Sequence, residues 1–408
     1  MPVRRVAMLS VHTSPLAQPG AGDGGGMNVY VRSLASNLAR AGVACDVLTR
    51  AEHAEQPPVI EVERGFRVVH IGAGPAVPIP KQDLLPLVEP FADAALSFVA
   101  GQNVPYDVLH ANYWISGAVG HRLKHELDLP LVATFHTLDR VKAEAGVGED
   151  VATRARVEGE IISCADLMIA ATDEEREQLV ALYGAHRDRV EVVPPGVDHG
   201  VFVPGDRAAA RRALGLEVSA PMLLVVGRIQ PLKGADLAVR CLAELDPSAT
   251  LLVVGGPSGD DGETEVRELH TLVSELGLED RVRFVPPQPH DRLTAYYQAA
   301  DVCLVPSRTE SFGLVALEAA ACGTPVVAAD VGGLRSVVDD GQTGFLVEGR
   351  HPRDYAAPVD LLLSDRELSR AMGASASAAA SRYMWSIAAA RLRRLYGDLA
   401  ARAPVECT

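Results

Sequence analysis

The sequence predicts an α/β protein made of two doubly wound halves, each a parallel sheet covered by helices. Short apolar runs alternate with amphipathic stretches along the chain, and the runs are apolar at successive positions. The alternation is typical of βαβ units, and continuous apolar runs indicate strands that are buried on both faces of a parallel sheet. The length of 408 residues also exceeds what one hydrophobic core usually serves.

The first half is expected to begin with a strand, a glycine-rich loop and a helix. Apolar residues recur at helical spacing from Val31 to Leu38, and Gly42 is placed to end this helix. The alternation continues to a Pro- and Gly-rich stretch at 194–206, which we interpret as a linker. Strands of this half are expected at 6–11, 45–49, 67–71, 107–111, 131–136, 167–172 and 190–196.

A second series of apolar runs follows the linker and predicts the second half. The expected division is residues 1–200 and 201–384, with a last helix at 385–408 that packs back on the first half. Ligands of doubly wound folds bind at the carboxyl ends of the strands, so a cleft between the halves is the expected site. Strands of the second half are expected at 222–227, 250–256, 281–286, 301–306, 325–329 and 344–347.

Charge and composition exclude some partners. The formal net charge of −15 argues against binding to nucleic acid or an anionic membrane, and no apolar run is long enough to span a bilayer. A cytoplasmic protein is expected, and a homodimer is compatible with these features. The cysteines show no Cys-x-x-Cys pair, which favours reduced thiols in the core, with Cys407 as an exposed thiol in a polar tail.

The glycine loop "GDGGGMNVYV" precedes the first expected helix. Glycine allows a ligand to approach the backbone, and the first N–H groups of a helix favour an anion. The loop is neither a Walker loop nor a good dinucleotide fingerprint. It predicts an anion site, with an ordinary turn as the alternative.

Two cations in "GRIQPLKG" follow the first strand of the second half. Arg228 and Lys233 are expected at a strand end that faces the cleft. A guanidinium grips two oxygens and an ammonium neutralises further charge, which suits a diphosphate. The alternative is two surface charges in a loop.

Two carboxylates occur in "TESFGLVALEA". Ser311 is the expected N-cap of a helix, with Glu310 ahead of it and Glu318 about two turns into it. Both carboxylates could then accept hydrogen bonds from the hydroxyl pairs of a sugar or ribose. The alternative is a pair of solvated surface carboxylates.

A polar pocket is expected in the first half. His136 ends a strand, and Tyr113, Thr137, Lys142 and Arg154 follow strands or helices nearby in the sequence. A lone histidine at a strand end is more often structural, but the polar residues near it in the sequence favour a binding pocket. No metal-ligand spacing of His, Cys or Asp is found, so no metal site is expected.

The motifs "GGGMNVYV", "GRIQPLKG", "ESFGLVALEA" and "CGTPVVA", in this order, resemble the retaining family 4 glycosyltransferases of the GT-B fold. The resemblance covers nearly the whole chain. The start is most similar to the branch that transfers N-acetylglucosamine from UDP-GlcNAc to 1D-myo-inositol 3-phosphate in actinobacterial mycothiol biosynthesis. The resemblance implies a nucleotide sugar and a small polar acceptor as partners, and no cofactor required for the chemistry. The sequence gives no indication of Mg²⁺.

The resemblance also implies roles for single residues. The first half would bind the acceptor and the second half the nucleotide sugar. His136, Arg228, Lys233 and Glu310 would be catalytic. Residues implied for the donor are Gln18, Pro19, Gly26, Arg228, Lys233, Gln288, Glu310, Glu318 and Thr324. Those implied for the acceptor are His12, Asp23, Gly24, Gly25, Gly26, Met27, Asn28, Lys81, Tyr113, Thr137 and Arg154.

Some positions depart from that branch and leave alternatives open. Asn112 stands where the branch usually has a histidine, and "TFHTLDRVK" is similar to a run of the sucrose-phosphate synthases. A second reading is therefore transfer to another small acceptor, such as a sugar phosphate, an alcohol or a thiol, with a GDP-sugar as a further donor. A third is a non-transferring epimerase or sugar-nucleotide-binding protein.

Overall fold

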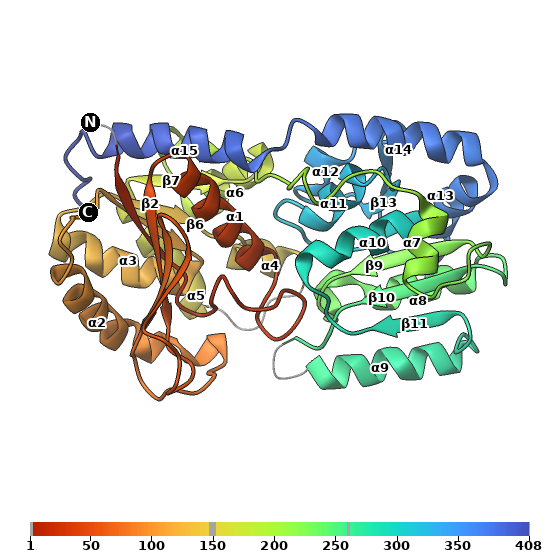
Figure 1. The fold of residues 1–408 in the computed structure, drawn as a ribbon, viewed down its shortest axis with the longest axis horizontal. Coiled ribbons are helices and arrows are strands. Elements are labelled where there is room, and N and C mark those ends of the chain that lie inside the picture. Colours follow the sequence, from red (N-terminus) through yellow and green to blue (C-terminus); the bar gives the residue numbers. More distant parts are fainter. Residues whose placement is uncertain (1–2, 147–151, 259–261, 408) are drawn as a thin grey trace. The chain divides into compact units, whose positions relative to one another are not determined.

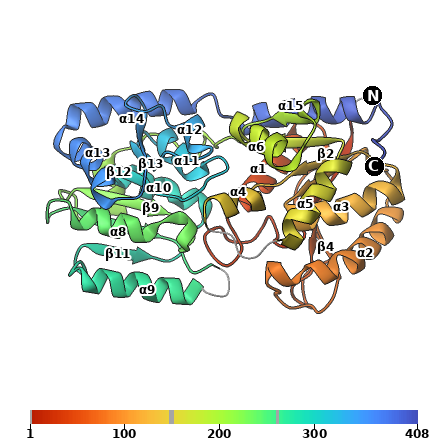
Figure 2. The ribbon, with the colours of Figure 1, turned by 180° about the vertical axis from the view of Figure 1, so that it is seen from behind.

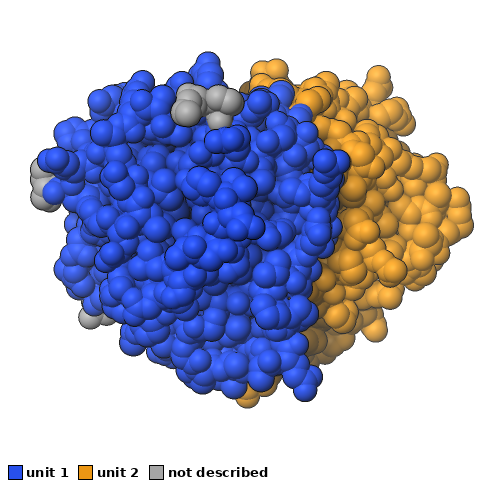
Figure 3. Space-filling view, turned by 60° about the vertical axis from the view of Figure 1, so that its left-hand side comes forward, with its two compact units in different colours: residues 1–17, 26–196, 385–408 blue, residues 18–25, 197–384 orange. Residues whose placement is uncertain are grey.

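The structure is a computed structural model that describes residues 3–146, 152–258 and 262–407. The chain packs as two compact units, coloured separately in Figure 3. Unit 1 consists of Met1–Ala17, Gly26–Gly196 and Trp385–Thr408. Unit 2 consists of Gln18–Gly25 and Val197–Met384. The expected division differs from these units in two places, the segment 18–25 and the boundary after residue 196.

Unit 1 holds an eight-stranded sheet in the order β3-β4-β2-β1-β5-β6-β7-β8. Every neighbouring pair is parallel except β3 and β4, which are antiparallel. β3 was not expected, because it is a half-exposed edge strand without a continuous apolar run. The strands are β1 Arg5–Leu9, β2 Ala44–Arg50, β3 Val59–Glu63, β4 Phe66–Ile71, β5 Val108–Asn112, β6 Leu131–Thr134, β7 Leu167–Ala170 and β8 Val190–Val192.

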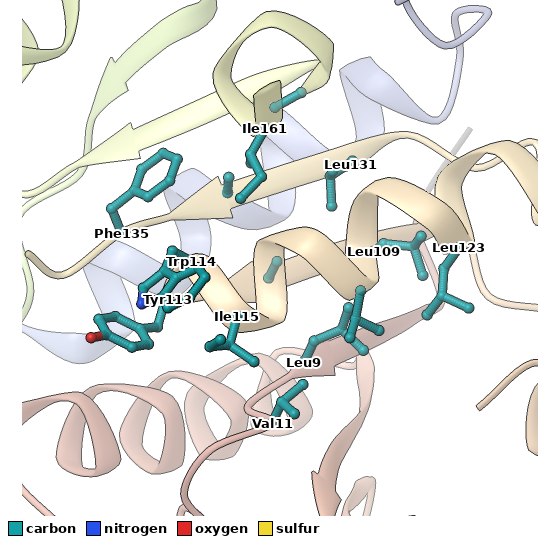
Figure 4. Packing of buried hydrophobic residues seen from close by; sticks show 14 of the residues in the cluster. Leu9, Val11, Leu109, Tyr113, Trp114, Ile115, Leu123, Leu131, Phe135 and Ile161 are labelled. Carbon is teal, nitrogen blue, oxygen red and sulfur yellow. The ribbon is translucent and has the colours of Figure 1, made fainter. Parts of the chain in front are cut away.

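Helices cover both faces of this sheet because its strands are apolar on both sides. Leu9, Leu109 and Leu131 pack with Ile115 and Ile161 of the helices in one core (Figure 4). In Figures 1 and 2, α1 and α15 lie side by side, and α2, α3 and α5 form a second group. The helices are α1 Gly26–Arg40, α2 Val88–Ala100, α3 Trp114–Leu127, α4 Asp139–Glu144, α5 Ala152–Cys164, α6 Asp173–Tyr183 and α15 Trp385–Leu399.

Unit 2 holds a parallel six-stranded sheet in the order β11-β10-β9-β12-β13-β14. The order reverses between β9 and β12, which is where doubly wound folds bind ligands. Its strands are β9 Met222–Val226, β10 Thr250–Val254, β11 Val282–Val285, β12 Val302–Val305, β13 Val326–Ala329 and β14 Gly344–Val347. Its helices are α7 Arg207–Ala213, α8 Ala235–Ala243, α9 Gly262–Glu275, α10 Leu293–Ala299, α11 Leu314–Ala321, α12 Leu334–Val337, α13 Pro352–Ser364 and α14 Arg366–Ala380.

The predicted fold class of two doubly wound sheets is confirmed, and every expected strand is present. The first helix also has the expected buried face, and Gly42 ends it in the left-handed conformation with φ 85°. Among the helices that the structure describes, none is long and apolar enough to cross a bilayer.

Three local expectations were wrong. Ser311 does not cap a helix, because α11 begins at Leu314 and is preceded by Gly313 with φ 99°. Glu318 is the fifth residue of this eight-residue helix, so it lies little more than one turn from the start. Cys407 is not an exposed thiol: it is half-buried and forms a disulfide with Cys164, whereas Cys45, Cys241, Cys303 and Cys322 are free and buried.

A buried ionic cluster links strands β1, β2 and β4 of the unit 1 sheet. Asp46 of β2 accepts hydrogen bonds from Arg67 Nε at 2.7 Å, from Arg5 Nε at 3.2 Å and from the Tyr106 hydroxyl. Burial alone would raise the pKa of Asp46, but the hydrogen bonds from Arg67, Tyr106 and Arg5 outweigh it and hold the pKa below its usual value. The carboxylate therefore compensates two arginine charges in a region with little access to water.

We predict that Asp46→Asn lowers the free energy of unfolding by about 3 kcal/mol or more, because it leaves two partly buried guanidinium groups without a counter-charge. Asp93→Asn is the matched control, because Asp93 pairs with Arg122 through a side chain that is 68% exposed. Asp93→Asn should lower the free energy of unfolding by less than about 1 kcal/mol. Urea unfolding at neutral pH measures both, and equal losses would contradict the prediction.

Candidate functional site

The expected cations and one carboxylate of unit 2 lie at the point where the strand order reverses. Arg228 follows β9, Lys233 closes the short 3-10 helix Pro231–Lys233, and Glu310 follows β12. β9 and β12 are neighbours in the sheet, so their carboxyl ends share one edge. The topology therefore gathers residues that are about 80 positions apart in the sequence at one place.

Lys233 and Glu310 form an ion pair with 2.6 Å between Nζ and Oε2. The side chains are 26% and 17% exposed, so both remain accessible to a ligand. Close backbone packing positions the pair. A Cβ on Gly234 would lie 2.2 Å from the Pro306 carbonyl oxygen, and one on Gly332 would lie 2.2 Å from the Glu310 carbonyl oxygen. Only glycine fits at these two positions, so the loops can hold the two charges together.

Glu318 is held in a buried hydrogen-bond network. It is 5% exposed, and its carboxylate accepts from the Tyr297 hydroxyl at 2.8 Å and contacts His290 Nε2 at 2.7 Å. Burial and the neighbouring Glu318 raise the pKa of Tyr297, so this hydroxyl remains a donor. Thr324 donates to the Tyr297 carbonyl oxygen at 2.7 Å and thereby fixes Tyr297. Sequence reasoning did not identify His290 or Tyr297.

The segment Gln18–Gly25, which includes the start of the glycine loop, belongs to unit 2 and packs against its strand ends. Gly256 N–H donates to the Gly20 carbonyl at 2.9 Å, and the Gln18 side chain donates to the Gln288 carbonyl. A Cβ on Gly25 would lie 3.4 Å from Arg228 Nε, so the loop backbone lies against this guanidinium. The expected residues Gln18, Pro19, Asp23, Gly24 and Gly25 belong to this segment, whereas Gly26, Met27 and Asn28 begin α1 in unit 1.

Unit 1 brings three of the expected acceptor residues together, with Tyr113 and Thr137 beside Arg154. Its guanidinium donates to the Tyr113 hydroxyl at 3.2 Å and to the Thr137 carbonyl and hydroxyl oxygens at 2.7 and 3.1 Å. Arg154 is 8% exposed and pairs with the fully buried Glu158 at 2.8 Å. Tyr113, Glu158 and Asp139 outweigh the effect of burial and raise the pKa of Arg154, so the cation is permanent.

The loop after β1 contributes to the same site. The His12 ring lies 4.5 Å from the Tyr113 ring, measured between centroids. Asn28 holds this loop by donating to Thr13 Oγ1 at 2.8 Å and to the Ser14 carbonyl at 2.7 Å. Lys81 opens the 3-10 turn Lys81–Asp83, between β4 and α2. The segment that carries Lys81 contributes none of the Arg154 hydrogen bonds given above.

His136 and Tyr113 have left-handed backbones, with φ 60° and 77°. Non-glycine residues adopt this conformation at a cost of about 1–3 kcal/mol, and such positions cluster at functional sites. Tyr113 follows β5 directly and His136 comes two residues after the neighbouring strand β6, which places both at one edge of the sheet.

Burial, with smaller contributions from His110 and His12, lowers the pKa of His136 to about 3. The ring is therefore neutral at physiological pH, and its Nε2–H donates to Asn112 Oδ1 at 2.9 Å. Asn112, which the sequence showed only as a departure from a related pattern, thus fixes the tautomer of His136. Lys142 lies in the neighbouring helix α4.

Comparisons with known proteins agree with the fold. The model described as Glycosyltransferase Family 4 matches residues 24–201, and that described as Glycosyl transferases group 1 matches residues 206–378. The D-inositol 3-phosphate glycosyltransferase of Nocardia farcinica is 50% identical over 402 residues, covering 96% of this chain and 89% of the relative. A sucrose-phosphate synthase from Thermosynechococcus elongatus has a TM-score of 0.91 at 35% identity, covering 98% of this chain and 99% of that chain.

We predict that His136 stays neutral from about pH 5 to 8, because its pKa is lowered far below that range. Hydrogen–deuterium exchange at the imidazole C2 position, followed by mass spectrometry of the peptide, measures this pKa. Asn112→Asp should raise the pKa, because a carboxylate beside Nε2 stabilises the imidazolium. A midpoint for His136 within this range in the unsubstituted protein would contradict the prediction.

Proposed function

The chain belongs to the family 4 glycosyltransferases of the GT-B fold, and on this premise we propose that it transfers N-acetylglucosamine from UDP-GlcNAc to 1D-myo-inositol 3-phosphate, with retention at the anomeric carbon. The observation that carries the acceptor proposal is the buried Arg154 cluster, a permanent cation that also holds a tyrosine and a threonine hydroxyl. Guanidinium and hydroxyl groups together are typical ligands of a phosphate. The related proteins named D-inositol 3-phosphate glycosyltransferase support the same acceptor.

Unit 2 is proposed to bind the nucleotide sugar. Arg228 and Lys233 would stabilise the diphosphate, and Glu318 and Glu310 would accept hydrogen bonds from ribose and sugar hydroxyls. The partly exposed Lys233–Glu310 pair supports this, because an ammonium and a carboxylate that already lie together can each take a new partner when a charged, hydroxylated ligand enters. Glu318 already receives two hydrogen bonds, and each of its oxygens retains a further acceptor site.

The proposed reaction forms one bond and breaks one bond on the same face of the sugar. The acceptor hydroxyl oxygen bonds to the anomeric carbon as the bond from that carbon to the diphosphate oxygen breaks. The acceptor proton passes to the leaving phosphate. Arg228 and Lys233 stabilise the charge that develops on the diphosphate, which is commonly the largest catalytic term. His136 would donate to the transferred sugar through its backbone, because the neutral ring already donates its single N–H to Asn112. It does not act as a general base.

A second candidate acceptor is a sugar phosphate, because the solved sucrose-phosphate synthase is similar over the whole chain. Its phosphate would use the same Arg154 cluster. Release of UDP from UDP-GlcNAc or UDP-glucose, measured with inositol 3-phosphate, inositol and fructose 6-phosphate, separates the candidates. Inositol 3-phosphate with UDP-GlcNAc should be the best pair. Efficient use of unphosphorylated inositol, or a preference for fructose 6-phosphate, would overturn the proposed acceptor.

We predict that Arg228→Ala or Lys233→Ala lowers kcat by about 100-fold or more, because each removes a charge that stabilises the leaving diphosphate. Arg212→Ala is the control, since Arg212 is an exposed arginine on α7 of the same unit. Rates are measured at saturating donor. A near-normal kcat in either site variant would show that its cation does not act on the diphosphate.

Arg154→Ala is predicted to raise the KM for the acceptor much more than the KM for the donor, because the phosphate loses its buried cation. Arg154→Lys keeps the charge but not the planar guanidinium, so its KM for the acceptor should lie between those of the unsubstituted protein and Arg154→Ala. The matched control is Arg156→Ala, two residues along the same helix, where the side chain is 61% exposed. Thermal melts monitor folding, and equal increases in both KM values among folded variants would contradict the acceptor role.

A further inference from the structure

Four side chains with metal-binding atoms meet on unit 1, and none belongs to the candidate site. His121 and His125 lie on α3, Cys164 ends α5, and Cys407 lies in the segment after α15. One ligand atom from each residue lies within 4.8 Å of the others. Three separate segments therefore contribute to one small cluster of nitrogen and sulfur atoms.

His125 is the common neighbour within the cluster. Its Nε2 lies 3.4 Å from the Cys164 sulfur and 3.1 Å from the Cys407 sulfur. The His121 ring is 5.2 Å from the His125 ring, because residues four apart share one face of a helix. The two sulfurs are joined as a disulfide in this structure. A disulfide needs only the two cysteines and does not account for the two imidazoles beside them.

The C-terminal segment is also held here without the sulfur atoms. Val405 N–H donates to Asp166 Oδ1 at 2.6 Å. Lys124 links the same carboxylate to α5, because its Nζ donates to Asp166 Oδ2 at 2.8 Å and to the Cys164 carbonyl at 2.7 Å. This hydrogen bond attaches the chain to Asp166 two residues before Cys407, independently of the sulfur atoms.

We propose that the reduced chain binds Zn²⁺ through His121, His125, Cys164 and Cys407, in a structural site that clips the C-terminal segment to α3 and α5. Two thiolates and two imidazoles are a donor set that Zn²⁺ takes in closed tetrahedral sites. Bond lengths of about 2.0–2.3 Å place tetrahedral ligand atoms roughly 3.3–3.8 Å apart, so small side-chain movements suffice. Binding releases the two thiol protons and involves no change of oxidation state. The disulfide form must first be reduced by a thiol or phosphine.

Metal binding by the full chain tests the proposal directly. The protein is reduced with a phosphine, freed of metal and titrated with Zn²⁺ against a chromophoric chelator, and one ion should bind per chain. Co²⁺ is then used as a spectroscopic probe. Visible bands typical of tetrahedral Co²⁺ and a thiolate-to-cobalt charge-transfer band are expected. Absence of these bands, or no Zn²⁺ retained against the chelator, would overturn the site and leave a disulfide only.

Single variants assign the ligands. His125→Ala and Cys407→Ser should each weaken Zn²⁺ binding by at least about tenfold. Replacing even the groups that hydrogen-bond to metal ligands lowers metal affinity by about that factor. His186→Ala is the control, because His186 is an exposed histidine elsewhere on the same unit. Carboxypeptidase digestion of the unsubstituted chain gives a second readout, because Zn²⁺ should slow removal of the C-terminal residues. Unchanged affinity in both ligand variants would contradict the assignment even if some Zn²⁺ binds.

Discussion

Every proposed catalytic group depends on one constraint: the strands of a parallel sheet end at the same edge. Tyr113 and His136 follow neighbouring strands of unit 1, and Arg228 and Glu310 follow neighbouring strands of unit 2. Because the strands are buried on both faces, polar side chains are placed where the strands stop. The loops at these ends must then pack closely, and glycines such as Gly332 permit backbone approaches that a Cβ would block.

The two units hold their charges in physically different ways. Arg154 is buried with Glu158 and bound to fixed hydroxyls, so its position is set before any ligand arrives. Lys233 and Glu310 are partly exposed, and such pairs are worth about 1 kcal/mol or less, so a ligand can replace the contact at little cost. In the proposed reaction, Arg154 would bind the acceptor phosphate from a fixed position. The Lys233–Glu310 pair could rearrange as charge develops on the leaving diphosphate.

Local periodicity was sufficient to predict most of the architecture from the sequence. Continuous apolar runs located the strands, because a strand buried on both faces leaves no polar positions. The helical spacing from Val31 to Leu38 predicted the buried face of α1. The motifs placed Arg228 and Lys233 at a strand end and Glu310 ahead of a helix, because each motif follows an apolar run that predicts a strand. The half-exposed strand β3 and the true start of α11 at Leu314 were missed, since neither carries a strong local pattern.

Only the tertiary structure decided which side chains meet. His290 contacts Glu318 across 28 positions, and Asn112 fixes the tautomer of His136, although no local pattern connects either pair. Cys407 lies beside Cys164 at a sequence separation of 243, so their spacing carried no signal for either a disulfide or a metal site. The physical reason is that periodicity reports which face of an element is buried. Contacts between distant elements depend on how whole layers pack, and that information is not contained in any short stretch of the chain.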